Sequence, residues 1–268
     1  MKTPVRRTST AGRRAATVLA AAGTALAGTL LAAPGAHAAD SDITFSDVVV
    51  NKGQPVVLGT GAEVEVPVTY TLKTKVRLDG FWVELYRGTW GHYEDRLDNA
   101  IQQYCPKSSS GGYTYYDCDD TLFYSPRTFV NSDAGTWKTY GTAVKVGGGY
   151  DDDLLAPSVS IRRASLIESA DASPEPVTSG EPITVKGTLK RANWNTRRYD
   201  LYGGQRVTLQ FKAAGTTAYT SVRTITTTPT GAMRTTVTAS KDGTWRWYYA
   251  GNSVTGAKAT TGDYVDVR

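Results

Sequence analysis

The stretch Val64-Glu65-Val66-Pro67-Val68-Thr69-Tyr70-Thr71-Leu72 places an apolar side chain at every second position. Successive side chains of a β-strand point to opposite faces, so this pattern buries one face of a strand and leaves the other in water. The same alternation recurs at residues 81–85, 137–143, 183–189, 207–211, 233–239 and 245–249, and turn-forming clusters rich in Gly, Pro, Asn and Asp lie between these segments. Many short strands with such turns predict an all-β chain of antiparallel sandwiches, with a helical turn expected only within residues 93–103.

The first 38 residues have the pattern of a secretory signal peptide. Residues 1–14 contain five basic residues and no acidic one, residues 15–33 are mostly Ala, Leu, Val, Gly and Thr, and Ala36-His37-Ala38 follows. A basic start, an apolar run and an A-x-A end are typical of a segment that is removed during export. No other apolar run approaches the roughly 18 residues that a membrane span needs. We therefore expect a secreted, extracellular protein that begins at Ala39.

Charge divides the remaining 230 residues into two parts. Residues 39–162 contain 11 basic and 17 acidic side chains, whereas residues 163–268 contain 14 basic and 8 acidic ones. The net charges of −6 and +6 cancel, which excludes a globally basic nucleic-acid binder. The change falls within residues 158–172, which have the pattern of a nearly continuous strand. We expect one sandwich over residues 39–162 and a second over 163–268, with almost no residues left for a hinge.

Two cysteines are present, so their pairing is unambiguous. Cys105 and Cys118 enclose a short segment rich in Ser, Gly and Tyr, and an exported protein can keep a disulfide oxidised. The spacing is not the C-x-x-C of redox proteins. We expect a structural disulfide that stabilises the fold by about 3 kcal/mol.

The second half carries a sequence pattern that resembles a known group of proteins. Its parts are a Pro-rich entry at residues 172–182, Ile183-Thr-Val-Lys-Gly187, Val207-Thr-Leu-Gln210, Gly243-Thr-Trp-Arg-Trp247 and Val265-Asp-Val267. The pattern resembles the immunoglobulin-like domains of secreted actinobacterial proteins, mostly uncharacterised, some of which are labelled calcium-binding. The resemblance implies two tandem antiparallel immunoglobulin-like β-sandwiches and export. It implies no catalytic residues.

Residues for catalysis are scarce. His92 is the only histidine after residue 38, and no G-x-S-x-G motif is present, which argues against hydrolytic triads. The three glycines at 147–149 precede Asp151, Asp152 and Asp153, whose charge would repel a phosphate group. We therefore expect a protein that is not an enzyme. A hydrolase that uses a pair of carboxylates remains a third alternative.

Two acidic groups are candidate metal sites. Asp117, Asp119 and Asp120 flank Cys118, and Asp151, Asp152 and Asp153 follow the glycine run. Calcium binds six to eight oxygen atoms, several of them from carboxylates on a shaped loop. Neither group matches the EF-hand pattern. Solvated acidic loops that keep sheet edges apart are the alternative interpretation.

Aromatic and basic residues occur together in the connection that follows Leu189. The candidate ligand-binding residues there are Arg191, Trp194, Arg197, Arg198, Tyr199 and Tyr202. Rings with cations suit an anionic glycan or a partner surface, although a solvated arginine loop or charge neutralisation against the first domain would also explain them. In contrast, Trp245, Trp247 and Tyr249 alternate along one strand and are expected in the core.

These observations predict a secreted, non-enzymatic binding or adhesion-type module that acts at the cell envelope or in the extracellular matrix. The expected partners are an anionic cell-wall glycan or another envelope protein, with no nucleic acid and no membrane span. The alternative function is extracellular calcium binding by acidic loops of the first domain. Apart from calcium, no cofactor is expected.

Overall fold

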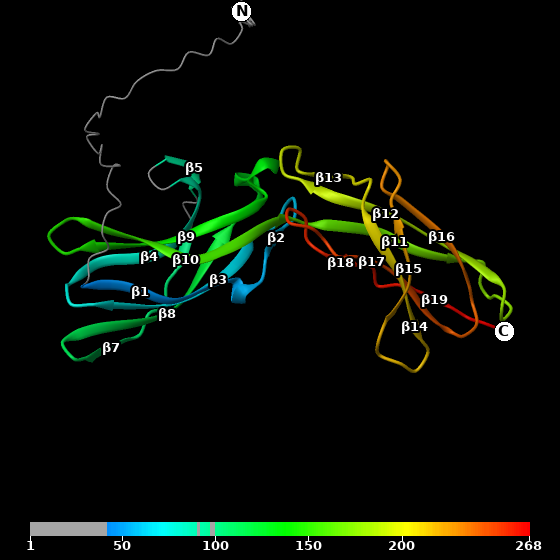
Figure 1. The fold of residues 1–268 in the computed structure, drawn as a ribbon, viewed down its shortest axis with the longest axis horizontal. Helices are drawn as coiled ribbons and strands as arrows, with labels where there is room; N and C mark the ends of the chain where they lie inside the picture. The colour runs from blue at the N-terminus through cyan, green and yellow to red at the C-terminus, as the bar shows by residue number, and fades with distance from the viewer. Residues whose placement is uncertain (1–41, 90–91, 97–99) are drawn as a thin grey trace, which may run out of the picture. The chain divides into compact units, whose positions relative to one another are not determined.

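The structure is a computed structural model that describes residues 42–89, 92–96 and 100–268 (Figure 1). The expected signal peptide, residues 1–38, lies outside the described residues. Within them the secondary structure consists of β-strands and three short 3₁₀ turns, at Asn51–Gly53, Pro126–Thr128 and Asn131–Asp133. This confirms the all-β prediction. In the described part of the chain, no helix is long and apolar enough to cross a membrane.

Ten strands that precede residue 164 form the first sandwich. One sheet has the order β1-β3-β8-β6, with β7 beside β8, and the other has the order β2-β10-β9-β4-β5. The first, second and fourth long strands (β1, β3 and β8) lie in one sheet and the third, fifth and sixth (β4, β9 and β10) in the other, which is an immunoglobulin-like arrangement. The strands are β1 (Ile43–Val50), β2 (Val56–Leu58), β3 (Val64–Thr74), β4 (Leu78–Thr89), β5 (His92–Arg96), β6 (Ala100–Gln102), β7 (Lys107–Ser110), β8 (Tyr113–Tyr124), β9 (Gly135–Lys145) and β10 (Tyr150–Arg163).

One pairing departs from the predicted antiparallel order. β1 pairs with β3 in one sheet, but β2 runs parallel to β10 in the other. The chain changes sheets through the turn at residues 51–55, where the Asn51 amide donates to the carbonyl oxygens of Gln54 (3.0 Å) and Pro55 (2.9 Å). The chain keeps its direction as it crosses from one sheet to the other. β2 therefore runs parallel to β10, the last strand of the first sandwich.

Nine strands form the second sandwich, which is also immunoglobulin-like. β12 lies between β11 and β16 and also pairs with β13, and the facing sheet has the order β15-β14-β17-β18, with β19 also on β17. The strands are β11 (Ser165–Ser173), β12 (Pro182–Asn193), β13 (Arg198–Leu201), β14 (Arg206–Ala213), β15 (Thr220–Thr226), β16 (Ala232–Thr238), β17 (Gly243–Tyr249), β18 (Lys258–Ala259) and β19 (Asp263–Val265). The chain therefore contains two tandem sandwiches.

The alternation in the sequence matches the burial of the strands. Val66, Val68, Tyr70 and Leu72 of β3 are buried in the core of the first sandwich. In β17 Trp245, Trp247 and Tyr249 are buried in the second core, as predicted, and the residues between them are half-buried. The prediction of a helical turn within residues 93–103 is wrong for the part of this segment that the structure describes. There β5 pairs with β4 and β6 pairs with β8 as strands.

The two sandwiches follow each other without a linker. β10 ends at Arg163 and β11 begins at Ser165. The Arg163 amide donates to the carbonyl oxygen of Val254 (3.0 Å), and the Gly256 amide donates to that of Arg163 (2.9 Å). The last residue of the first sandwich is thus hydrogen-bonded to a loop of the second.

Candidate functional site: the outer face of the first sandwich

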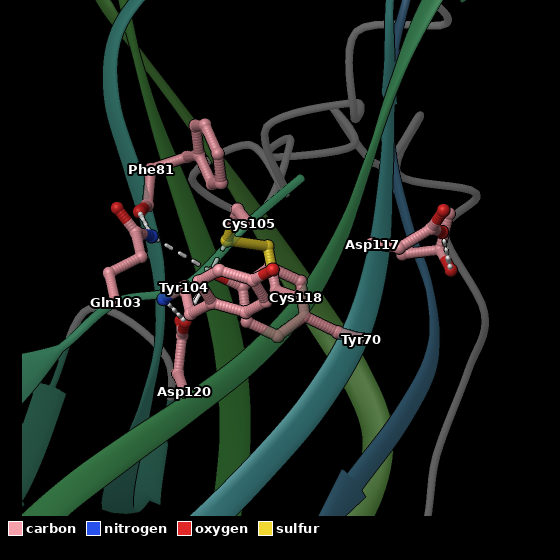
Figure 2. Close-up of a disulfide and its surroundings, with 9 residues drawn as sticks. Tyr70, Phe81, Gln103, Tyr104, Cys105, Asp117, Cys118 and Asp120 are labelled. Atoms are coloured by element: carbon pink, nitrogen blue, oxygen red, sulfur yellow. Dashed lines mark hydrogen bonds between the residues drawn. A yellow bond between two sulfur atoms is a disulfide. The ribbon is translucent and has the colours of Figure 1, made fainter. Parts of the chain in front are cut away.

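The alternation of side chains along β8 places the members of the first acidic group on two different faces of the strand. Asp117 and Asp119 are exposed, whereas Cys118 and Asp120 point inward and are buried. Figure 2 shows Asp117 and Asp120 on opposite sides of the strand. Successive residues of a strand face opposite ways, so the three carboxylates cannot surround one ion. Asp117 and Asp119 remain together on the outer face, and Asp120 belongs to the interior.

Asp120 is the centre of a buried polar network beneath the disulfide (Figure 2). Its carboxylate accepts hydrogen bonds from the Tyr70 hydroxyl (2.8 Å) and the Tyr104 amide (3.1 Å). The Gln103 amide group donates to the Tyr70 hydroxyl (3.3 Å) and to the carbonyl oxygen of Phe81 (2.7 Å). Burial raises the pKa of Asp120, and the hydrogen bonds from Tyr70 and Tyr104 oppose that rise. The network therefore fixes the segment before Cys105 against β3, β4 and β8.

Cys105 and Cys118 are joined in the predicted disulfide. The bonds from the Asp117 amide to the Pro106 oxygen (3.0 Å) and from the Asp119 amide to the Tyr104 oxygen (2.9 Å) flank it. The two sulfur atoms and an Asp120 oxygen lie within 4.8 Å of one another. Because the sulfur atoms are bonded to each other, they offer no thiolate, and this cluster lacks the donors of a metal site.

A surface pocket of about 350 Å³ lies on the outer face of this sheet. Asp47, Asp117 and Asp119 line it, together with Tyr104, which is 68% exposed. The lining also includes Thr69, Tyr70, Thr71 and Cys118. Asp47 has a positive φ of 54° at the point where the register between β1 and β3 shifts. This irregularity brings a carboxylate from β1 into the pocket, and the sequence pattern gave no indication of it.

A hairpin extends the same sheet beyond the pocket. β7 and β8 are joined by Gly111 and Gly112, with φ of 57° and 80°, the conformation of a type I′ turn. The ring of Tyr113 lies under two ammonium groups, those of Lys73 (4.0 Å from the ring centroid) and Lys75 (4.6 Å). The disulfide and the Asp120 network hold the base of this hairpin against the sheet.

The members of the second acidic group also lie on two different faces of their strand, β10. Asp151 and Asp153 of β10 are buried, while Asp152 lies on the other face and accepts from the Thr142 hydroxyl (2.7 Å). Burial raises the pKa of Asp153, as does the neighbouring charge of Asp151, and a hydrogen bond from the Phe45 amide opposes both. Opposite Asp153 in the sheet is Gly141, where a Cβ atom would lie 2.7 Å from the Phe45 ring. The candidate calcium group Asp151, Asp152 and Asp153 is therefore part of a strand that packs against β1.

Trp194 occupies a place that the sequence did not predict. Its side chain is fully buried in the core of the first sandwich, although it follows β12 of the second. The indole N–H donates to the carbonyl oxygens of Leu58 (3.2 Å) and Gly59 (3.0 Å), and the ring lies 5.4 Å from that of Phe129. A ligand could stack only on an exposed ring, so Trp194 offers no such surface in this structure.

Arg197 and two asparagines complete this contact. The Arg197 guanidinium donates to the carbonyl oxygens of Pro126 (2.9 Å), Phe129 (3.0 Å) and Arg127 (2.5 Å). The Asn131 amide group donates to Asn193 Oδ1 (2.8 Å). We name residues 193–197 the clamp, because these residues join the two sandwiches through specific hydrogen bonds.

The other four candidates of this segment lie outside the clamp. Arg198 is exposed on β13, and Tyr199 is half-buried against the first core. Arg191 stacks on Tyr202, with its guanidinium carbon 4.0 Å from the ring centroid. The predicted ligand-binding segment is thus two separate arrangements, the clamp and an arginine–tyrosine pair.

No protein-family model matches the chain, and no curated protein matches it. Among solved structures, the D00–D0 domain of intimin is 14% identical over 83% of this chain and 98% of its own, with a TM-score of 0.28. Fibronectin(III)-like modules of Clostridium thermocellum CbhA are 13% identical over 84% of this chain and 92% of their own, with a TM-score of 0.31. At these scores the similarity carries no argument about function, which must come from the site itself.

Proposed function

We propose that the protein is a secreted, non-enzymatic binding module that acts at the cell envelope or in the extracellular matrix. It contacts its partner, a glycan or another envelope protein, through the outer face of the first sandwich. This outer face consists of the pocket residues Asp47, Tyr104, Asp117 and Asp119 and the hairpin of residues 107–116.

The observation that carries the proposal is a pocket with a largely exposed tyrosine beside three carboxylates. An aromatic ring offers apolar area with little rotamer entropy to lose, and carboxylates accept strong hydrogen bonds. The adjacent hairpin is rich in Ser, Gly and Tyr, the residues that recognition loops favour. Because the disulfide and the Asp120 network support these residues, their ordering costs little on binding.

The test compares two tyrosines of similar exposure in one sandwich. Tyr104 is 68% exposed at the pocket, and Tyr150 is 72% exposed at the start of β10, outside the pocket. Binding of the full mature chain to isolated cell-envelope material should weaken about tenfold in Tyr104→Ala and stay unchanged in Tyr150→Ala. Equal retention of both variants would contradict the assignment of the outer face. Release of soluble fragments from the same material would contradict the non-enzymatic part.

Calcium binding is the second candidate, and the shared pocket of Asp47, Asp117 and Asp119 favours it. Three carboxylates with the Thr69 and Thr71 side chains provide the hard oxygen ligands that calcium prefers. Millimolar calcium should then raise the melting temperature of the wild type by mass action, and Asp119→Asn should abolish the rise.

Asp79→Asn is the matched control, because Asp79 is exposed on β4 and lies outside the pocket. It removes the same charge and should keep the calcium response. An identical response in both variants would indicate general screening by the ion, and the calcium proposal would fail.

A further inference from the structure

Two arginines meet where the first sandwich passes into the second. Arg163 is the last residue of β10. Ser165, two residues after Arg163, pairs with Arg191 of β12. Arg163 is 9% exposed, and its Nε donates to the carbonyl oxygen of Ala192 (2.7 Å). Burial lowers the pKa of Arg163 to about 10, and the charge of Arg191 lowers it as well. Arg163 is therefore charged at neutral pH, and Arg191 lies close enough for its charge to oppose that of Arg163.

No described carboxylate forms an ion pair with either arginine. Among the residues that the structure describes, neither arginine has a carboxylate oxygen within 4.0 Å. Asp200 pairs with Arg191 in the sheet, but it is exposed and accepts a hydrogen bond from Asn193 (2.5 Å). Its charge opposes the fall in the pKa of Arg163, but less strongly than burial and Arg191 cause it. Two adjacent positive charges in a partly buried place are unfavourable unless an anion balances them.

A buried donor at the same place is unsatisfied. Within the described ranges, Nε of Arg191 is buried and has no hydrogen-bond partner, and the buried hydroxyl of Thr255 lies beside the hydroxyls of Tyr202 and Tyr249. Thr255 is the bridge partner of Arg163, so its side chain belongs to this cluster. Arg191 lies with its face on Tyr202, which leaves the N–H groups at its edge free to donate. Buried donors without partners are rare in folded proteins and point to a missing acceptor.

We propose that Arg163, Arg191 and Thr255 form a binding site for a doubly charged tetrahedral oxyanion, a phosphate or sulfate group, at the junction of the two sandwiches. A dianion balances both guanidinium charges, whereas a carboxylate would balance one. The planar guanidinium fork donates two parallel hydrogen bonds to such a group. The site uses none of the residues of the outer face, so it stands independently of the function proposed above.

The experiment measures binding of inorganic phosphate and inorganic sulfate to the full mature chain by calorimetry and by melting temperature. Sodium chloride of equal ionic strength separates specific binding from screening. We expect saturable binding of phosphate or sulfate and a rise in melting temperature that chloride does not give. Arg191→Gln should weaken the affinity about tenfold or more, because it removes charge-assisted hydrogen bonds. Without the anion this variant should melt no lower than the wild type, because it also removes like-charge repulsion.

Arg198→Gln is the control, since it removes one charge from an exposed position on β13 and should bind like the wild type. A glycerol-phosphate polymer distinguishes the source of the group: tighter binding than inorganic phosphate indicates a polymer, and no binding indicates the free ion. The proposal is overturned if phosphate and sulfate act no differently from chloride, or if the two variants lose affinity equally. Asp119→Asn should leave oxyanion binding intact, which separates this site from the pocket.

Discussion

The outer face and the clamp each combine an aromatic ring with polar and charged residues, yet their rings have opposite positions. Tyr104 and Asp119 of the outer face are exposed to solvent. In the clamp, Trp194 is fully buried and Arg197 is bonded to main-chain oxygens of the first sandwich. Composition thus identifies segments that do more than connect strands. It does not say whether the partner is another molecule or the rest of the same chain.

The largest expected effect is on the clamp. Trp194→Ala should lower the free energy of unfolding by about 3 to 5 kcal/mol, because it empties a large site in the first core. Urea denaturation of the mature chain measures this change. Leu201→Ala is the control: Leu201 is exposed on β13, so its loss should cost about 0.5 kcal/mol or less. Similar losses in the two variants would show that Trp194 is not a core residue.

A smaller, pH-dependent effect is expected beneath the disulfide. Tyr70→Phe removes a hydrogen bond to the buried Asp120 carboxylate and should cost about 1 to 3 kcal/mol at pH 7. The pKa of Asp120 is already above its usual value of 3.8 in the folded state, and loss of this bond raises it further. The folded variant therefore holds its proton to higher pH than the unfolded chain, and its stability falls as pH rises through that pKa.

Urea denaturation at pH 4 and at pH 7 tests this sign. The deficit of Tyr70→Phe relative to the wild type should be smaller at pH 4, where Asp120 is protonated in more of the folded molecules. A deficit that does not change with pH, or that grows towards pH 4, would contradict the role given to the Asp120 charge.

The smallest effect on stability is expected on the outer face. Asp117→Asn and Asp119→Asn should each change the free energy of unfolding by about 0.5 kcal/mol or less, because both side chains are exposed. A loss above about 1 kcal/mol in either variant would show that these carboxylates are structural, and would weaken their assignment to a binding surface.

The strand pattern predicted most of the fold because one local rule, that alternate side chains of a strand face the same way, determines burial along β3 and β17. The same rule, applied to β8, would have separated Asp120 from Asp117 and Asp119, since these residues alternate in the strand. Cys105 and Cys118 were predicted because two cysteines allow one pairing. The position of Trp194 was not predictable, because it depends on a slot lined by Leu58, Gly59 and Phe129 that exists only in the folded chain. Asp47 was missed because an irregular strand register has no sequence pattern here.

The place of Trp194 also has a consequence for the order in which the chain acquires its structure. Synthesis runs from the N-terminus, so all ten strands of the first sandwich are available once Arg163 has been made. At that moment the largest aromatic side chain of the clamp is still missing from the first core. The sandwich that is made first is therefore completed by the one that is made second, and we expect Phe129, which packs against Trp194, to stay more exposed until then.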